Sequence, residues 1–307
     1  MIRLSYSEKH QIPLPSGHRF PIQKYTLVRE QLEYEGAIRK AQLFDPVFVE
    51  DAVIHRTHSA EWWARAKRQE LDAKEYRRIG FPNTEELVLR SISSASGTVR
   101  CALNALDDGA GMNLAGGTHH AFFDRGEGFC LLNDIALAAN HLLHENLVQR
   151  ILIVDLDVHQ GNGTASLFRD EPRVFTFSMH CQANYPFKKE ASDLDLALPA
   201  ATGDARYLEG LKEHVPRLME EFAPDIVFFQ SGVDVLASDR LGKLSLSRDG
   251  CRERDHWVIG HAHRLRLPLV VVMGGGYSER MSTLVNAHCE TYKTVLELYE
   301  KPRIFFN

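Results

Sequence analysis

Short apolar runs alternate along this chain with longer stretches in which apolar residues recur every three or four positions. The runs RILIVDLD, RVFTFSM, DIVFFQSG and LPLVVVMGG predict β-strands over 150–157, 173–179, 225–232 and 267–275. Between and after them, helical spacing predicts helices over 132–146, 205–221, 247–264 and 279–299. Continuous apolar strands separated by helices are typical of a parallel sheet that is covered on both faces.

The part of the chain before these strands is predicted to be rich in helix. Helical spacing favours helices over 59–79 and 84–107, and Asn133 is placed to cap the helix over 132–146. The sequence shows no linker, no low-complexity tract and no internal repeat. We therefore predict a single α/β domain over 1–307, with three α/β/α layers around a central, mostly parallel sheet.

Composition and charge narrow the class of protein. The 307 residues are 44% hydrophobic and 25% charged, as in ordinary globular domains. A net charge of -5 and the lack of any block of Lys or Arg argue against a nucleic-acid-binding surface or a membrane patch. The amino-terminal residues show no signal-peptide core, and the apolar runs are too short to span a bilayer.

Cysteine usage points to the same class. The five cysteines are odd in number and widely scattered, and no CxxC motif occurs; they are Cys101, Cys130, Cys181, Cys251 and Cys289. This pattern favours a reducing compartment and disfavours a disulfide framework or a cysteine-ligated zinc. We therefore expect a cytoplasmic enzyme.

Unusual polar residues follow directly after the predicted strands, where open parallel sheets bind ligands. In VDLDVHQGNG, Asp155, Asp157 and His159 occupy alternate positions, so in a strand they would point to one face. Asp157 and His159 could ligate one metal ion, with Asp155 supporting them or holding a different cation. A DxD motif can also hold Mg²⁺, and a strand end can simply carry solvated acids. The histidine in phase with the acids favours zinc or another metal that accepts imidazole.

The segment SGVDVLASD, which follows the strand over 225–232, supplies a candidate third ligand. Asp234 lies there among small residues, and taken alone it fits a structural role as well. Together with Asp157 and His159 it completes a set of three protein ligands. Three ligands with one open position are what a catalytic zinc site needs.

Two glycine-rich segments add candidate catalytic groups. In GGTHHAFFDRGEGF, the adjacent His119 and His120 are suited to handling protons beside a metal, and Phe129 would offer an aromatic wall. In VVMGGGYS, glycines allow the backbone to approach a ligand closely, and the hydroxyl of Tyr277 could donate to an oxyanion. A phosphate cradle is disfavoured because neither GxGxxG nor GxxxxGKS/T is present.

Taken together and in this order, GGTHHAFFDRGEGFCLLND, VDLDVHQGNGT, FSMH, SGVDVLASDRLGKLSLS and MGGGYS resemble the zinc-dependent histone deacetylase family, which has the arginase/deacetylase fold. The resemblance extends over about residues 16–280. The HQGNGT segment and the compact length look most similar to class IV-type and bacterial members of the family.

The resemblance implies a role for each matching residue. It implies that one Zn²⁺, or alternatively Fe²⁺, is bound by Asp157, His159 and Asp234. It implies catalytic roles for His119, His120, Tyr277, Asp155 and Asn162, with His120 as the base and Tyr277 as the oxyanion donor. It implies that the Gly128 carbonyl accepts the substrate amide N–H, that Phe129 and Tyr185 line an acyl-lysine tunnel, and that Leu241 lies near its mouth. A structural K⁺ or Na⁺ would be held by Asp155, Asp157, His159, Ser178 and Met179.

Two positions depart from the family pattern. Asn162 stands where one class of the family carries an acid as the partner of His120. An amide cannot stabilise imidazolium as an anion does, so His120 should stay neutral more readily. Lys24 aligns with the arginine that lies beneath the tunnel in the family, which puts the proposed exit route for the carboxylate product in question.

The expected activity is hydrolysis of the amide bond of an acylated lysine in a protein or peptide. An acetylpolyamine or another acetylated small amine is the alternative substrate for the same site. A binuclear manganese ureohydrolase is more remote, because Gln160, Gly161 and Asn162 stand where further acids would be expected. A reader that binds acyl-lysine without cleaving it should lack His120 or Tyr277, and both are present.

Overall fold

The computed structural model describes residues 1–300, and its centre is one sheet of eight strands. The strands are β1 (Arg3–Ser5), β2 (Leu43–Phe44), β3 (Ala110–Asn113), β4 (Ile151–Asp155), β5 (Val174–Cys181), β6 (Leu194–Leu198), β7 (Ile226–Gln230) and β8 (Leu269–Val272). Their order is β2-β1-β3-β8-β7-β4-β5-β6, and every neighbouring pair is parallel. The predicted α/β class with a mostly parallel sheet is confirmed.

The four strands predicted from the sequence form the middle of this sheet. β8, β7, β4 and β5 are neighbours, and all but one of their residues are buried. Strands covered on both faces need apolar residues at nearly every position, so their continuous apolar runs allowed these four strands to be predicted from the sequence. The other four strands were not predicted from the sequence.

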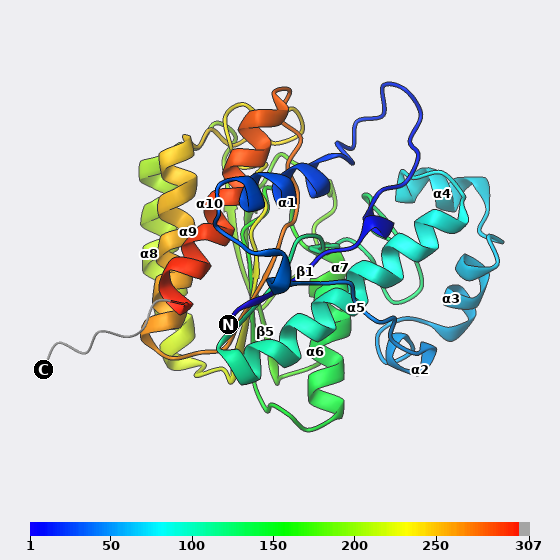
Figure 1. Ribbon diagram of the computed structural model, residues 1–307, viewed down its shortest axis with the longest axis horizontal. Helices are drawn as coiled ribbons and strands as arrows, with labels where there is room; N and C mark the ends of the chain where they lie inside the picture. Colours follow the sequence, from blue (N-terminus) through cyan, green and yellow to red (C-terminus); the bar gives the residue numbers. More distant parts are fainter. Residues whose placement is uncertain (301–307) are drawn as a thin grey trace, which may run out of the picture.

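Helices cover both faces of the sheet, as Figure 1 shows, with α8, α9 and α10 on one side and α5 and α6 on the other. The helices are α1 (Lys24–Tyr34), α2 (Asp51–Ile54), α3 (Ala60–Lys67), α4 (Ala73–Ile79), α5 (Glu85–Asp108), α6 (Asp134–His144), α7 (Asn162–Phe168), α8 (Asp204–Glu221), α9 (Arg248–Arg264) and α10 (Met281–Tyr299). The predicted helices over 84–107, 132–146, 205–221, 247–264 and 279–299 correspond to α5, α6, α8, α9 and α10. Asn133 caps α6 as predicted, because its side chain accepts from the backbone N–H of Ala136.

The single helix predicted over 59–79 is wrong, because two helices, α3 and α4, occupy this segment. Gln69 has a φ of 58°, which lies in the left-handed region and ends the first helix. Asp72 then starts the second helix, since its side chain accepts from the backbone N–H groups of Lys74 and Glu75. A capping box with Glu75 completes this new start, and it was the local signal for the break.

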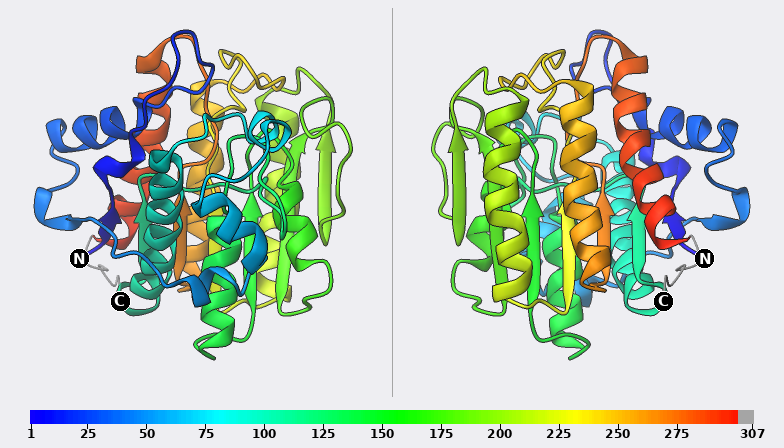
Figure 2. Two further views of the ribbon diagram at one scale, coloured as in Figure 1. Left: turned by 90° about the vertical axis from the view of Figure 1, so that its right-hand side faces the viewer. Right: turned by 90° about the vertical axis from the view of Figure 1, so that its left-hand side faces the viewer.

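The loops at the carboxyl ends of the parallel strands lie together at one end of the sheet (Figure 2). Because β4, β7 and β8 are neighbours, the segments that follow them meet there. All five cysteines are buried, and none is in a disulfide. Over residues 1–300, no helix has the length and apolar character needed to cross a bilayer.

Candidate metal centre and active site

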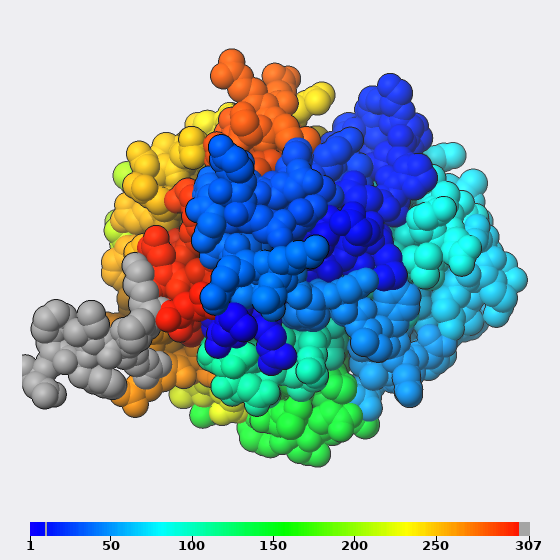
Figure 3. Space-filling model, viewed as in Figure 1, coloured from blue at the N-terminus to red at the C-terminus, as the bar shows by residue number. Residues whose placement is uncertain are grey.

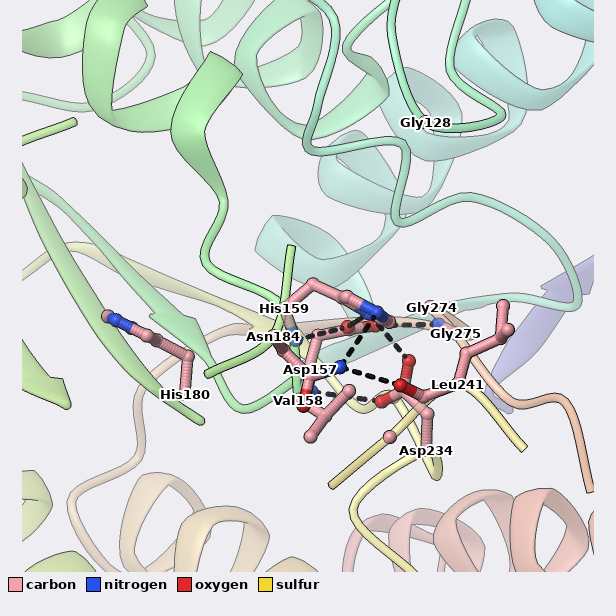
Figure 4. Close-up of polar contacts among 12 residues, drawn as sticks. Gly128, Asp157, Val158, His159, His180, Asn184, Asp234, Leu241, Gly274 and Gly275 are labelled. Atoms are coloured by element: carbon pink, nitrogen blue, oxygen red, sulfur yellow. Dashed lines mark hydrogen bonds and ion pairs between the residues drawn. The ribbon is translucent and has the colours of Figure 1, made fainter. Parts of the chain in front are cut away.

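Asp157, His159 and Asp234 lie together beyond the carboxyl ends of β4 and β7. One potential ligand atom from each residue falls within 4.8 Å of the others, and all three side chains are buried. The Nδ1 atom of His159 is 2.9 Å from Asp157 Oδ1 and 3.1 Å from Asp234 Oδ2. Figure 4 shows the imidazole facing both carboxylates. The three residues that the sequence proposed as metal ligands are therefore brought together.

Backbone N–H groups fix the two carboxylates in place. Val158 N donates to Asp234 Oδ1 at 2.9 Å, and Gly275 N donates to Asp157 Oδ2 at 2.8 Å. A Cβ atom on Gly275 would lie 2.0 Å from Asp234 Oδ2 and 2.7 Å from Asp157 Oδ2. Glycine is therefore required at this position if the backbone is to approach the carboxylates so closely.

The electrostatics of this group fit a bound cation. Burial, followed by the charge of Asp157, raises the pKa of Asp234 to about 7. Burial alone would lower the pKa of His159, but its hydrogen bonds with Asp157 and Asp234 raise it to about 10. The carboxylates of Asp157 and Asp234 are both buried and both contact His159, so they need a positive charge between or beside them. One imidazole nitrogen and carboxylate oxygens form a donor set that zinc accepts, so the residues present fit a single divalent ion.

The two adjacent histidines of the GGTHH loop lie beside this group. Their ring centroids are 4.1 Å apart, and His120 lies 5.9 Å from the His159 ring. His119 Nδ1 is 2.6 Å from Asp155 Oδ2, whereas His120 Nδ1 is 2.7 Å from Asn162 Oδ1. Burial, reinforced by the charges of His119 and His159, holds the pKa of His120 well below its usual value. The two histidines therefore have different partners, one an anion and the other an amide.

Asp134, the first residue of α6, positions the loop that carries these histidines. Its carboxylate is buried and accepts from the backbone N–H groups of Gly117 and Thr118 and from the Thr118 hydroxyl. On the opposite side of the loop, the Gln230 side chain donates to the carbonyl of Gly117 at 2.8 Å. The loop is thus held by α6 and by the end of β7.

Tyr277 follows the glycine loop after β8 and faces the same region. Its backbone N–H donates to Asp239 Oδ2 at 2.6 Å, and its ring centroid lies 6.4 Å from that of His159. Burial, followed by the charges of Asp234 and Asp157, raises the pKa of the phenol well above its usual value. Among residues 1–300, none forms a hydrogen bond with the Tyr277 hydroxyl, so it is a protonated donor with nothing to bind in the folded chain.

A cavity of about 400 Å³ leads from the surface to His120, His159 and Tyr277. The four residues proposed to bind substrate all line it; they are Gly128, Phe129, Tyr185 and Leu241. Gly128 and Phe129 both have positive φ, 53° and 67°, in a turn that hydrogen-bonds to the end of α4. The Tyr185 hydroxyl donates to Glu127 Oε2 at 2.6 Å, which fixes the ring against His120.

Of the residues proposed for a monovalent cation, Asp155, Ser178 and Met179 lie on the neighbouring strands β4 and β5, and Asp157 and His159 follow β4. Asp155 of β4 is paired in register with Ser178 of β5, and Met179 is buried. The Ser178 hydroxyl lies 3.0 Å from Nδ1 of His180, a ring that points away from the candidate metal ligands in Figure 4. The cation site itself stays a prediction.

Several residues that support the site were not singled out from the sequence. Asp239 and Glu127 stand inside the quoted motifs, so their acid character was the available signal. Asn184 donates to the carbonyl of Leu241 at 2.6 Å and accepts from Lys243 N at 2.9 Å. Arg254 of α9 is fully buried and donates to the carbonyl of Gly232 at 2.6 Å, and no local pattern marked it.

Lys24, where the family pattern has an arginine, lies fully buried beneath the glycine loop. Its ammonium group donates to the carbonyl of Gly274 at 2.8 Å and lies 5.6 Å from the centroid of the Tyr277 ring. Burial lowers the pKa of Lys24 to about 8. A cation therefore stays at this position despite the change of residue type.

Comparison with known proteins gives a consistent result. Residues 18–292 match the model of the histone deacetylase domain family. The chain is 40% identical over 294 residues to an uncharacterised protein of Picosynechococcus, covering 96% of this chain and 98% of that one. It is 29% identical over 296 residues to histone deacetylase 2 of Arabidopsis thaliana, covering 92% and 76% of the two chains. The crystal structure of the HDA15 HD domain superimposes with a TM-score of 0.78 at 18% identity, covering 98% of this chain and 92% of that chain.

Proposed function

The chain belongs to the histone deacetylase domain family, and we propose that it hydrolyses the amide bond of an acylated lysine in a protein or peptide. The observation that carries this proposal is the buried group of Asp157, His159 and Asp234 at the foot of a cavity that also reaches His120 and Tyr277. The group supplies ligands for one metal ion and leaves space for a substrate on one side.

Asp157, His159 and Asp234 would hold Zn²⁺ here, with Fe²⁺ as the other candidate. When bound, the ion supplies Lewis-acid polarisation of the acyl carbonyl and lowers the pKa of water. Side chains around the cavity would carry the remaining catalytic roles, which are to bind the amide, to move one proton and to stabilise an oxyanion.

In this proposal His120 would move the proton. Its Nδ1–H donates to the Asn162 carbonyl oxygen, an atom that can only accept, so Nε2 is left as the free base. In the proposed reaction the oxygen of water bonds to the carbonyl carbon and Nε2 takes the water proton. The proton passes from Nε2 to the leaving nitrogen, the C–N bond breaks, and a carboxylic acid and an amine are released; the acid then loses the second water proton to the amine or to solvent and becomes a carboxylate.

Tyr277 would donate to the oxygen of the tetrahedral intermediate, and His119 would add electrostatic stabilisation through its contact with Asp155. The Gly128 carbonyl would orient the substrate amide, while Phe129 and Tyr185 would enclose the acyl-lysine chain. A structural K⁺ or Na⁺ near Asp155 and Ser178 belongs to the same proposal. So does the assignment of residues 1–307 to one catalytic domain.

The set of potential metal ligands does not support a binuclear ureohydrolase. Over residues 1–300, the Asp157, His159 and Asp234 group is the one cluster of three or more potential ligands. A binuclear centre needs bridging carboxylates and additional ligands, and Asn162 faces His120 instead of a metal.

The test is carboxylate release by the zinc-loaded protein from an acetyl-lysine peptide, a long-chain acyl-lysine peptide and an acetylpolyamine. Turnover of a peptide with little release from the polyamine supports a lysine deacylase, and the preferred chain reports the depth of the tunnel. Release from the polyamine alone would move the function to small-amine hydrolysis. No carboxylate release from any of the three substrates would contradict amide hydrolysis.

A further inference from the structure

The mouth of the cavity is surrounded by positive charge, although the protein as a whole is acidic. Its outer lining includes Arg19, Arg77, Arg78 and Lys243, and all four side chains are exposed. Among the described residues that line the cavity, none is an aspartate or a glutamate. A chain of net charge -5 therefore concentrates cations at the one place where a substrate must enter. We call these four residues the basic rim.

The arginines of the rim are not engaged elsewhere. Among residues 1–300, no carboxylate forms an ion pair with Arg19, Arg77 or Arg78. Lys243 donates to the backbone carbonyl of Ala183 at 2.9 Å, which leaves its charge without a carboxylate. Unpaired cations at a cavity mouth attract anions and repel cations.

Backbone hydrogen bonds fix the rim relative to the candidate site. The carbonyl groups of Arg78 and Ile79, at the end of α4, accept from the backbone N–H groups of Gly128 and Phe129. His18 Nε2 lies 2.9 Å from the Gly80 carbonyl, and this contact ties the segment of Arg19 to α4. In Figure 3 this amino-terminal segment stands beside the cyan surface of α4.

The opposite side of the mouth is held in a similar way. Asn184 joins the loop of Tyr185 to the loop of Lys243, since its side chain accepts from Lys243 N and donates to the Leu241 carbonyl. Phe187, on the Tyr185 loop, is 90% exposed at this edge. An exposed aromatic ring beside four cations suits a polypeptide, which offers both apolar and charged side chains to one surface.

From these observations we propose that the amine side of the substrate is anionic and is an acyl-lysine flanked by Asp or Glu residues in a peptide or protein. This inference rests on the proposed amide hydrolysis, in which the acyl group enters the cavity and the amine carrier stays at the mouth. The basic rim then contacts the residues on either side of the lysine. The same charges disfavour an acetylated polyamine, whose protonated amines would lie against the rim.

The size of the effect follows from exposed charge pairs. One exposed ion pair changes an equilibrium constant by about 1.4- to 5-fold. Two or more pairs between the rim and flanking acids should therefore change kcat/KM by roughly 10-fold between acidic and basic peptides. The preference should weaken as ionic strength rises, because the Debye length falls from about 10 Å at 0.1 M salt to about 3 Å at 1 M.

The experiment compares three acetyl-lysine peptides that are identical except for two flanking positions on each side, filled with Glu, Gln or Lys. We expect kcat/KM of the zinc-loaded protein to be highest for the Glu peptide and at least roughly 10-fold lower for the Lys peptide and for an acetylpolyamine. The double variant Arg77→Gln/Arg78→Gln should lower the Glu-to-Lys ratio about threefold or more. Arg217→Gln/Arg264→Gln, which removes two exposed charges from the ends of α8 and α9, should leave the ratio unchanged.

Equal kcat/KM values for the three peptides, within about twofold, would overturn the rim proposal and leave hydrolysis intact. The same holds if the polyamine is the best substrate. If no peptide is cleaved, the proposed function fails. The Kd values of the three peptides for Tyr277→Phe, measured by fluorescence anisotropy, then show whether the basic rim favours the acidic peptide. Tighter binding of the Glu peptide, reduced in the rim double variant, supports the rim without hydrolysis. Equal Kd values contradict it.

Discussion

Tyr277→Phe separates a catalytic role for this hydroxyl from a structural one. Among the described residues, none bonds to the hydroxyl, so the variant removes no hydrogen bond from the folded chain. The ring contacts with Phe129 and His159 would be kept. We therefore expect the free energy of unfolding to change by less than about 0.5 kcal/mol.

The catalytic cost of the same change should be large. Removing one oxyanion donor costs about 2.7–4 kcal/mol of transition-state stabilisation, which is a loss of about 10²- to 10³-fold in kcat. KM should change little, because the hydroxyl is proposed to bind the intermediate more strongly than the substrate. The assay is carboxylate release from an acetyl-lysine peptide, run beside thermal unfolding of the same preparation.

Tyr292→Phe is the matched control. The Tyr292 hydroxyl is buried and donates to the carbonyl of Asn113 at 2.7 Å, between α10 and β3. Its loss leaves a buried acceptor unpaired and should cost about 1–3 kcal/mol of stability while kcat stays within about twofold. A Tyr277→Phe protein that keeps more than about a tenth of the wild-type kcat would refute the oxyanion assignment. A loss of stability as large as that of the control would refute the claim that the hydroxyl is free.

Three further predictions test the surroundings of the site. Asn162→Asp places an anion beside Nδ1 of His120, which stabilises the imidazolium and raises its pKa, so the acidic limb of the kcat/KM profile should move to higher pH; an unmoved limb would contradict His120 as the base. Lys24 has a pKa of about 8 in the folded chain against 10.5 in the unfolded one, so only the unfolded state stays protonated between these values. The free energy of unfolding should therefore rise with pH in that window by up to about 3 kcal/mol relative to Lys24→Met, measured by urea denaturation at pH 7 and pH 10; a difference that does not depend on pH would refute it. Gly275→Ala forces a Cβ atom within 2.0 Å of a carboxylate oxygen and should reduce bound zinc, measured by elemental analysis, to less than about a tenth. Gly260→Ala, which meets nothing within 4 Å on α9, should keep its zinc, and equal zinc in both variants would refute the role of the glycine.

The parts of the fold that could be predicted from the sequence are those in which a single local pattern, such as an unbroken apolar run, determines the structure. β4 and β7 are buried at every position, so their apolar runs were unbroken. β6 is half-exposed at the edge of the sheet and carries Asp195, and β2 has only two residues, so neither produced a pattern. The capping box at Asp72 was a local signal for the break between α3 and α4, but the prediction over 59–79 rested on helical spacing alone.

The candidate site was readable for a different reason. Its residues directly follow strands, and parallel strands bring their carboxyl ends to one edge, so Asp157, His159 and Asp234 converge without further information. The supporting contacts are long-range and leave no local trace. Lys24 meets the Gly274 carbonyl across 250 positions, and Arg254 meets the Gly232 carbonyl from a separate helix. Such contacts depend on how helices pack, which periodicity does not specify.

The most direct test of the central claim is the number of moles of carboxylate released per mole of protein from an acetyl-lysine peptide, before and after removal of the metal. The account predicts many turnovers by protein that carries one zinc per chain. Dialysis against a chelator should abolish the release, and stoichiometric Zn²⁺ or Fe²⁺ should restore it. Contradictory results would be no release by the zinc-loaded chain, or release that persists when no metal remains.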